Sequence, residues 1–328
     1  MRTIGLHSIL IFLFLIGSVF AKQDFFSQAN TLYDQGKYME AIKYYRAAIQ
    51  EGQYEPFAWF NLGNSLIQIG KHNIAMVAYK RSTELAPKFV RPWMLLGDLY
   101  FTHDDYGLAI AAYRRASELG ENSEHLHYAK AECYRKLGEW TLAQKEYEQV
   151  LKLNQDRIDC WLALAEIQEK LEDYPEAVRV LRKAIELTPT AGAEAFFYLA
   201  YLQLEQDSTT KGIQALEDGL LLNPGNLLAR RHLASLYQNQ GSPWMSVFTL
   251  EQGLDTKNTK DRSDLHVDLG QVYFDQERFD ESLNHFVEAW KLGNVQGRIG
   301  AENVGNSFFN SGDTLKAEYA YRRIRLKQ

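Results

Sequence analysis

Three side chains near the middle of the chain have the chemical types that ligate metal ions. His125 and His127 stand two residues apart, and the thiol of Cys133 follows them. Imidazole and thiolate groups suit Zn²⁺ when three or four of them converge on one point. In a helix, however, residues two apart do not face each other, so the two imidazoles point in different directions. The sequence therefore predicts no metal site and no cofactor.

The motifs of the common catalytic sites are missing from the sequence as well. It contains no glycine-rich phosphate loop, no HExxH pair and no GxSxG nucleophile elbow. Two carboxylate-rich stretches, SEHLHYAKAE (123–132) and LAEIQEKLEDYPEA (164–177), have the composition of solvated helix faces. We predict that the chain is not an enzyme, has no catalytic residue and takes no small-molecule substrate.

The composition is that of an ordinary globular protein. Of the 328 residues, 46% are hydrophobic and 24% are charged, and the net charge is −6. A protein that binds nucleic acid needs a basic stripe, which this mildly acidic balance does not supply. We therefore predict no nucleic-acid partner.

The first 21 residues, MRTIGLHSILIFLFLIGSVFA, have the layout of a signal peptide. A cation near the start precedes an apolar run over residues 9–16, and Val19 and Ala21 are small residues at positions −3 and −1 of a cleavage site. The run is short for a transmembrane helix, which needs about 20 apolar residues. We predict cleavage before Lys22 and export, most simply to a bacterial periplasm. An uncleaved N-terminal membrane anchor is the alternative.

Small residues recur along the chain at intervals of 34 to 36 residues. One series consists of Ala29, Gly63, Gly97, Ala131, Ala165, Ala200, Ala234, Gly270 and Gly305. A second series, twelve residues later, consists of Ala41, Ala75, Ala109, Ala143, Ala177, Gly212, Ser246, Ser282 and Ala317. A tyrosine, leucine or phenylalanine follows each member of the second series four residues on. These registered series predict nine copies of one structural unit.

Each unit is predicted to be a helix, a short turn and a second helix. Small residues suit the crossing of two helices, where the axes approach closely, and the large residue fills the space between neighbouring units. Glycines such as Gly70 and Gly138 recur at the turn, where they adopt positive φ without strain. Pro87 and Pro224 follow second helices and end them. Because no unit can bury its apolar face alone, the units are expected to stack.

This pattern resembles the tetratricopeptide repeat family, in which an aromatic residue, Leu-Gly and Tyr mark the first helix and Ala, Phe or Tyr, Ala and Pro mark the second. The matching residues in two successive repeats are Trp59, Leu62, Gly63, Gly70, Ala75, Tyr79 and Pro87, and then Trp93, Leu96, Gly97, Tyr100, Tyr106, Ala109, Tyr113 and Ala116. The resemblance covers residues 24–328 as nine repeats that begin near residues 22, 56, 90, 124, 158, 193, 227, 263 and 298. It implies an all-α, right-handed superhelical solenoid over residues 22–328, preceded by the signal peptide.

In the proteins that this chain resembles, the first helices line a concave groove. The equivalent positions predict a peptide-binding groove formed by Phe57, Phe60, Asn61, Asn64, Arg91, Met94, Asp98, Tyr128, Glu132, Arg135, Phe197 and Tyr201. We expect the aromatic members of this set not to be needed for stacking the repeats. Rigid aromatic surfaces with a few amides and charges are what extended peptides and amphipathic helices bind.

Asn61 and Asn64 leave two interpretations open. Some proteins of the family that the chain resembles hold a terminal carboxylate with two asparagines and three cations. Asn30 and Asn61 match the two amides and Arg91 matches one cation, but the other two cations are missing, which makes an anion site weak. The pair at 61 and 64 therefore either caps local backbone groups and hydrates the groove, or grips the backbone of a bound peptide.

Together these features predict a non-catalytic interaction scaffold in the cell envelope, which binds a peptide or helix of one or more envelope proteins in its groove. Two alternatives remain: a luminal co-chaperone of the secretory pathway that binds unfolded chains, and a regulatory accessory subunit of an envelope enzyme. The basic C-terminal stretch TLKAEYAYRRIRLKQ has two interpretations. It supplies favourable charge at a helix C-terminus, or it forms a surface for dimerisation or for peripheral contact with a membrane.

Overall fold

The computed structural model of the protein describes residues 24–188 and 192–325. The chain divides into two units, Met1–Leu153 and Asn154–Gln328, and each is described by itself. The predicted signal peptide, residues 1–21, lies outside the described residues. Within the described stretches, no helix combines the length and the apolar character that crossing a membrane requires.

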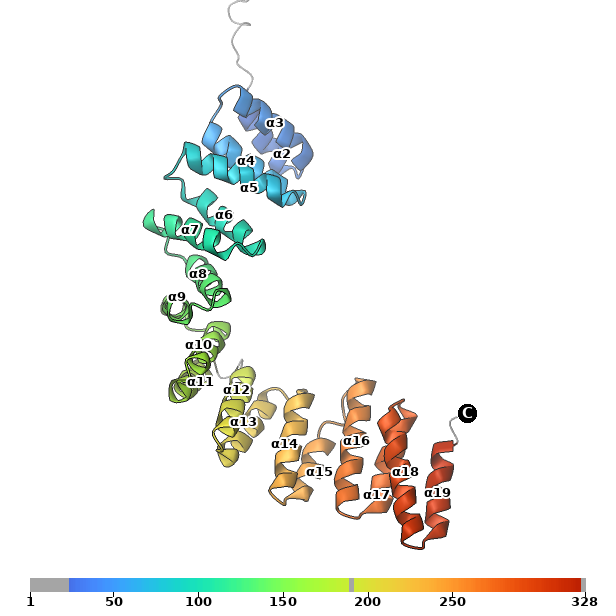
Figure 1. Cartoon of the computed structure of the whole chain (residues 1–328). Coiled ribbons are helices and arrows are strands. Elements are labelled where there is room, and N and C mark those ends of the chain that lie inside the picture. The colour runs from blue at the N-terminus through green and yellow to red at the C-terminus, as the bar shows by residue number, and fades with distance from the viewer. Residues whose placement is uncertain (1–23, 189–191, 326–328) are drawn as a thin grey trace, which may run out of the picture. The chain divides into compact units, whose positions relative to one another are not determined.

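The first unit consists of four helix pairs, coloured from blue to green in Figure 1. Its helices are α2 (Phe25–Asp34), α3 (Tyr38–Gln50), α4 (Glu55–Gln68), α5 (His72–Leu85), α6 (Val90–Thr102), α7 (Tyr106–Glu118), α8 (Glu124–Lys136) and α9 (Trp140–Leu153). The two helices of each pair pack against each other. The first helices of neighbouring pairs also touch, since α2 contacts α4 and α6 contacts α8.

The second unit consists of five helix pairs. Its helices are α10 (Ile158–Lys170), α11 (Tyr174–Leu187), α12 (Ala193–Glu205), α13 (Thr209–Leu222), α14 (Leu227–Asn239), α15 (Pro243–Glu251), α16 (Thr259–Asp275), α17 (Phe279–Lys291), α18 (Val295–Asn310) and α19 (Thr314–Arg325). First helices again touch, because α10 contacts α12 and α16 contacts both α14 and α18. Neither described stretch of the chain contains a strand, so the predicted all-α fold of stacked helix pairs is confirmed.

The turn between the two helices of a pair contains a residue with positive φ in each described pair. Five of these residues are glycines, such as Gly70 with a φ of 72°. The other four turns place an acidic residue there, with φ between 54° and 63°: Asp104, Glu172, Asp207 and Glu277. For a residue with a side chain, the left-handed conformation is roughly 1–2 kcal/mol less favourable than the right-handed one. The four acidic turns are therefore strained relative to the glycine turns.

The small residue of a first helix makes room for the large residue of the second helix in the same pair. A Cβ atom on Gly63 would lie 2.5 Å from Cε1 of Tyr79, and Gly97 and Tyr113 repeat this relationship at 2.5 Å. Both tyrosine rings are buried. Each ring therefore fills the crossing of its own helix pair, a contact that was not part of the prediction that the large residue fills the space between neighbouring units.

The pair α14–α15 departs from the repeat pattern, because α15 begins at Pro243 and has only nine residues. The side chain of Arg230, 4% exposed, fills the space beside Gly253, where a Cβ atom would lie 2.7 Å from Arg230 Cδ. Its guanidinium donates hydrogen bonds to the carbonyl oxygens of Thr249 (2.9 Å) and Pro224 (2.6 Å). A buried cation with satisfied donors thus takes the place of an apolar core residue, and burial lowers its pKa.

Candidate functional site

A row of hydrogen bonds links the second helices to the first helices that face the predicted groove. In five repeats the buried or half-buried tyrosine of the second helix donates its hydroxyl to an oxygen fifteen residues earlier. The acceptors are Asn30 for Tyr45 (2.7 Å), Asn64 for Tyr79 (2.8 Å), Asp98 for Tyr113 (2.7 Å), Glu132 for Tyr147, and Asn306 for Tyr321 (2.6 Å). We call these the tyrosine–acceptor pairs. Burial raises the pKa of Tyr45, Tyr79 and Tyr113, which keeps these hydroxyls protonated as donors.

The side chains of Asn61 and Asn64, the two asparagines of α4, take part in this row of hydrogen bonds. The side-chain oxygen of Asn64 accepts from Tyr79, and the side-chain amide of Asn61 donates to Asn30 Oδ1 at 3.0 Å. These two bonds go to other side chains rather than to the local backbone groups that one of the two interpretations expected. The physical reason is that the small residue between them, Gly63, brings the Tyr79 ring close enough for its hydroxyl to reach Asn64.

An open cavity of about 900 Å³ lies beside this row in the first unit. Its walls come from the first helices α2, α4 and α6, from the turn that follows α4, and from the second helix α5, which contributes His72, Asn73, Ile74 and Tyr79. Apolar side chains line much of it, namely Tyr33, Ile67, Leu95 and Leu99, and the polar members include Asn64, Gln68, Asp98, Thr102 and His103. We call this cavity the N-terminal groove.

Two of the predicted groove residues, Asn64 and Asp98, line the N-terminal groove. Asp98 is held at one oxygen by the Tyr113 hydroxyl and by His125 Nε2, which lies 3.3 Å away. This hydrogen bond raises the pKa of His125. The carboxylate is therefore fixed in position among the lining residues of the groove, which also include the cation Lys71.

The expectation that Phe60 and Phe197 are not needed for packing is wrong. Phe60 is only 7% exposed, and its ring packs edge-on against Phe89 with centroids 5.0 Å apart. The ring of Phe197 occupies the space over Gly219, where a Cβ atom would lie 2.5 Å from Phe197 Cε1. Phe60 is part of the core and Phe197 is half-buried, because Phe89 and Gly219 provide surfaces on which these rings pack.

Two other predicted aromatic residues keep exposed surface. Phe57 is 49% exposed and rests against Phe89, with ring centroids 5.1 Å apart. Tyr201, in the second unit, is 45% exposed and stacks on Tyr198, and both hydroxyls donate to the carboxylate of Glu169. These two rings are available to a ligand, but they belong to different units.

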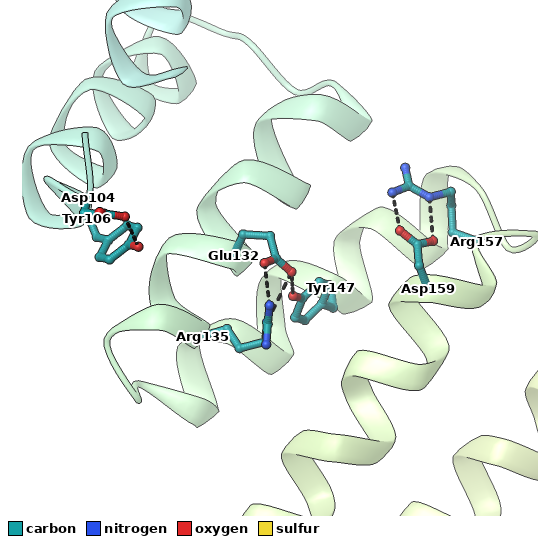
Figure 2. A network of polar contacts seen from close by, with 7 residues as sticks. All are labelled: Asp104, Tyr106, Glu132, Arg135, Tyr147, Arg157 and Asp159. Carbon is teal, nitrogen blue, oxygen red and sulfur yellow. Dashed lines mark hydrogen bonds and ion pairs between the residues drawn. The ribbon is translucent and has the colours of Figure 1, made fainter. Parts of the chain in front are cut away.

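Figure 2 shows the Glu132 carboxylate between Arg135 and Tyr147. Arg135 Nη2 donates to Glu132 Oε2 at 2.8 Å, and the Tyr147 hydroxyl donates to the other oxygen. The ring of Tyr128 lies edge-on to that of Tyr147, with centroids 6.2 Å apart. Three predicted groove residues, Tyr128, Glu132 and Arg135, are thus brought together around one tyrosine of α9.

The last two predicted residues, Arg91 and Met94, lie on α6 but do not line the N-terminal groove. The Arg91 side chain is exposed, whereas Met94 is half-buried and packs against the core formed by α6, α7 and α8. Met94 therefore contributes to the stacking of the repeats.

Several residues that line the N-terminal groove are absent from the predicted site. Tyr33 and Ile67 occupy the same repeat position, 34 residues apart, near the ends of α2 and α4. That shared position was a usable signal for both. Leu99 and His103 had no such signal, because no member of the predicted groove set occupies their repeat positions.

His127 is placed as expected, away from His125. Its two ring nitrogens lie 2.6 Å from Glu146 Oε2 and 2.7 Å from Asn122 Oδ1, and its side chain is buried. Cys133 is buried as well. Among the residues that the structure describes, no three histidine, cysteine, aspartate or glutamate side chains cluster as a metal site would require.

Comparison with known proteins agrees with the helix-pair architecture. A model of the tetratricopeptide repeat matches residues 26–88, 60–124 and 162–226, which together make up half of the chain. A model of subunit 3 of the anaphase-promoting complex, or cyclosome, matches residues 102–184. No curated protein matches the chain by sequence.

Several solved structures resemble the chain at low identity. The C-terminal part of a TPR repeat-containing protein from Cytophaga hutchinsonii is 17% identical over 72% of this chain and 97% of its own, with a TM-score of 0.59. The complex of Naa15 and Naa10 bound to HypK-THB is 16% identical over 92% of this chain and 50% of the matched chain, with a TM-score of 0.54. YrrB, a TPR protein with an unusual peptide-binding site, is 19% identical over 56% and 95%, with a TM-score of 0.49.

These likenesses bear on the fold alone. The nine described helix pairs and the family model, which matches half of the residues, agree with each other. The chain belongs to the tetratricopeptide repeat family.

Proposed function

We propose that the protein is a non-catalytic interaction scaffold that binds a peptide or helix of a partner protein in the N-terminal groove. The observation that carries the proposal is the open cavity of about 900 Å³ that α2, α4, α5 and α6 line. Tyr33, Ile67 and Leu95 give this cavity an apolar wall, and Asn64 and Asp98 are fixed polar groups beside it.

The way in which the cavity is built favours an elongated ligand. Equivalent repeat positions recur among its lining residues, Tyr33 with Ile67 on α2 and α4, and Asn64 with Asp98 on α4 and α6. Binding a helix or an extended peptide in a groove uses such a series, with apolar anchors between polar contacts. The matching family models describe repeats and a subunit of a complex, which supports a partner of protein nature.

The compartment is part of the proposal. Residues 1–21 have the charge and apolar pattern of a signal peptide, which supports a scaffold that acts on proteins of the cell envelope. Mass spectrometry of the native protein gives the test. We expect an N-terminus at Lys22 and recovery from the envelope fraction, and a chain that starts at Met1 in the cytosol would contradict the proposed location.

Binding in the groove is tested by crosslinking and pull-down from an envelope extract. In Gln68→Trp a bulky ring replaces an exposed side chain that lines the groove. The matched control Val77→Trp places the same ring on α5, at an exposed residue outside the lining. We expect a stoichiometric partner that the control retains and Gln68→Trp loses.

The other outcomes separate the remaining possibilities. A partner retained by both variants would place its binding surface outside the groove. Capture of many unrelated unfolded chains would indicate a co-chaperone. A single enzyme as the captured partner would indicate an accessory subunit.

A further inference from the structure

Two histidines of the second unit face each other across one helix pair. His266 lies on α16 and His285 on α17, and their Nδ1 atoms are 3.0 Å apart. The ring of Tyr273 stacks on that of His285, with an interplanar angle of 17° and centroids 5.4 Å apart. Both imidazoles are half-buried. Packing therefore holds two nitrogen atoms at a fixed separation.

The surroundings keep both rings neutral at pH 7. Burial lowers the pKa of His266, and burial together with the neighbouring His266 lowers the pKa of His285 to about 4. Glu288 on α17 acts in the opposite direction on both rings, and Arg262 on α16 adds to the lowering at His266. Neutral imidazole is the form that binds metal ions, so no proton has to be removed from the pair before a cation binds.

We propose that the Nδ1 atoms of His266 and His285 chelate a divalent transition-metal ion of the copper or nickel type. Two nitrogens 3.0 Å apart, each about 2.0–2.1 Å from a metal, subtend roughly 95° at it. An angle near 90° is that of neighbouring ligands in a square-planar or octahedral complex, which Cu²⁺ and Ni²⁺ form, whereas Zn²⁺ prefers the wider tetrahedral angle.

The coordination would be completed by water. Among the described residues no third histidine, cysteine, aspartate or glutamate joins the pair at ligand distance. The nearby Glu288 carboxylate is paired with Lys291 Nζ at 2.7 Å and is not a ligand in this arrangement.

The histidine pair carries the same number of protons before and after the metal binds. In the metal-free pair, one Nδ1 carries a hydrogen and donates it to the other Nδ1. When the metal bonds to both Nδ1 atoms, that hydrogen moves through water to Nε2 of the same ring. One hydrogen bond is lost, two metal–nitrogen bonds form, and no proton is released to bulk solvent.

The test is a titration of the full chain with Cu²⁺, Ni²⁺ and Zn²⁺, each followed by calorimetry, with electron paramagnetic resonance for the copper sample. We expect one saturable site per chain for Cu²⁺ and Ni²⁺, weaker binding of Zn²⁺, and nitrogen splitting from two imidazoles in the copper spectrum. The variants H266Q and H285Q should each lose affinity by at least about tenfold, the lower end of what losing even a supporting partner of a metal ligand costs.

The matched control is H232Q, which removes an exposed imidazole of α14 in the same unit. It should bind as the wild type does, and circular dichroism shows whether each variant remains folded. The absence of a saturable Cu²⁺ site in the wild type would overturn the proposal. So would a copper spectrum that H285Q leaves unchanged, or binding that H232Q abolishes and H285Q retains. If a variant does not fold, the number of nitrogen ligands in the wild-type copper spectrum still decides whether two imidazoles bind the metal.

Discussion

The hydroxyl of Tyr79 donates a hydrogen bond to Asn64 Oδ1 at 2.8 Å, from the second helix of a repeat to its first. The edge of the same ring lies over Gly63, so one side chain closes the helix crossing and also fixes a polar group that lines the groove. The architecture and the candidate binding surface thus depend on the same contact.

Tyr79→Phe keeps the ring over Gly63 and removes only the hydroxyl. The oxygen of Asn64 then loses its donor in a half-buried setting, and we expect the free energy of unfolding to fall by about 0.5–1.5 kcal/mol. Urea denaturation measures this change. The control Tyr319→Phe removes a hydroxyl from an exposed ring of α19 and should change stability by less. Equal losses in the two variants would refute a special role for the Tyr79 bond.

Gly63→Ala introduces a Cβ atom only 2.5 Å from Tyr79 Cε1. Because the ring is buried and has no room to move, we expect a loss of about 1–3 kcal/mol, as overpacking of a core gives. Gly107→Ala is the matched control, since nothing lies within 4 Å of its added Cβ at the start of α7. Alanine is the better helix former there, so the control should gain up to about 1 kcal/mol. Thermal denaturation of both proteins makes the comparison.

Glu277→Gly relieves the left-handed backbone of the turn between α16 and α17, where φ is 59°. The strain of about 1–2 kcal/mol at a residue with a side chain exceeds the roughly 0.5–1 kcal/mol entropic cost of glycine. The net effect should be a gain of up to about 1 kcal/mol. The reverse change, Gly70→Ala, should destabilise, although its added Cβ has open space around it. Unfolding midpoints in urea test both directions, and shifts of the same sign would contradict the argument.

The pair of His266 and His285 should make the second unit sensitive to acid. Both have a lowered pKa, to about 4 for His285, so the unfolded chain binds protons more readily than the folded one. Their contribution to stability is fully present above the ordinary histidine pKa of about 6.5 and is lost as the pH falls towards 4.

The measurement is the thermal midpoint between pH 7.5 and 4. In His285→Phe a ring still packs on Tyr273 but no longer titrates, so its curve should fall less steeply with acid than that of the wild type. Parallel curves would show that the acid sensitivity arises elsewhere in the chain.

The fold could be predicted from the sequence because the registered small residues fix a period, and that period fixes helix pairs. The site was harder to predict. Phe60 occupies a groove position in the repeat pattern, yet it is buried against Phe89, a residue of the connection between repeats that the pattern leaves undefined. Leu99 and His103 line the cavity from positions that the pattern assigns elsewhere.

Contacts between helices could not be predicted from the sequence either, because they depend on how two helices pack. Asn64 could be seen as a groove residue, but its bond to Tyr79 depends on how far apart two helix axes lie. His266 and His285 are nineteen residues apart and on different helices, so no local motif marks them. The spacing of residues along one helix indicates which of them lie on the same face of that helix. To predict a contact between two helices, the distance between their axes must also be known.

The tyrosine–acceptor pairs join residues only fifteen positions apart, and the rings of Tyr79 and Tyr113 also rest on the first helices of their own repeats. Chains dominated by such short-range contacts fold within microseconds to milliseconds, because little loop entropy is lost before a contact forms. Each helix pair can therefore act as its own nucleus, and opening can start at one repeat while its neighbours stay closed. Amide hydrogen exchange should accordingly show a separate rate for each repeat, with the slowest exchange in the helices that a buried tyrosine joins.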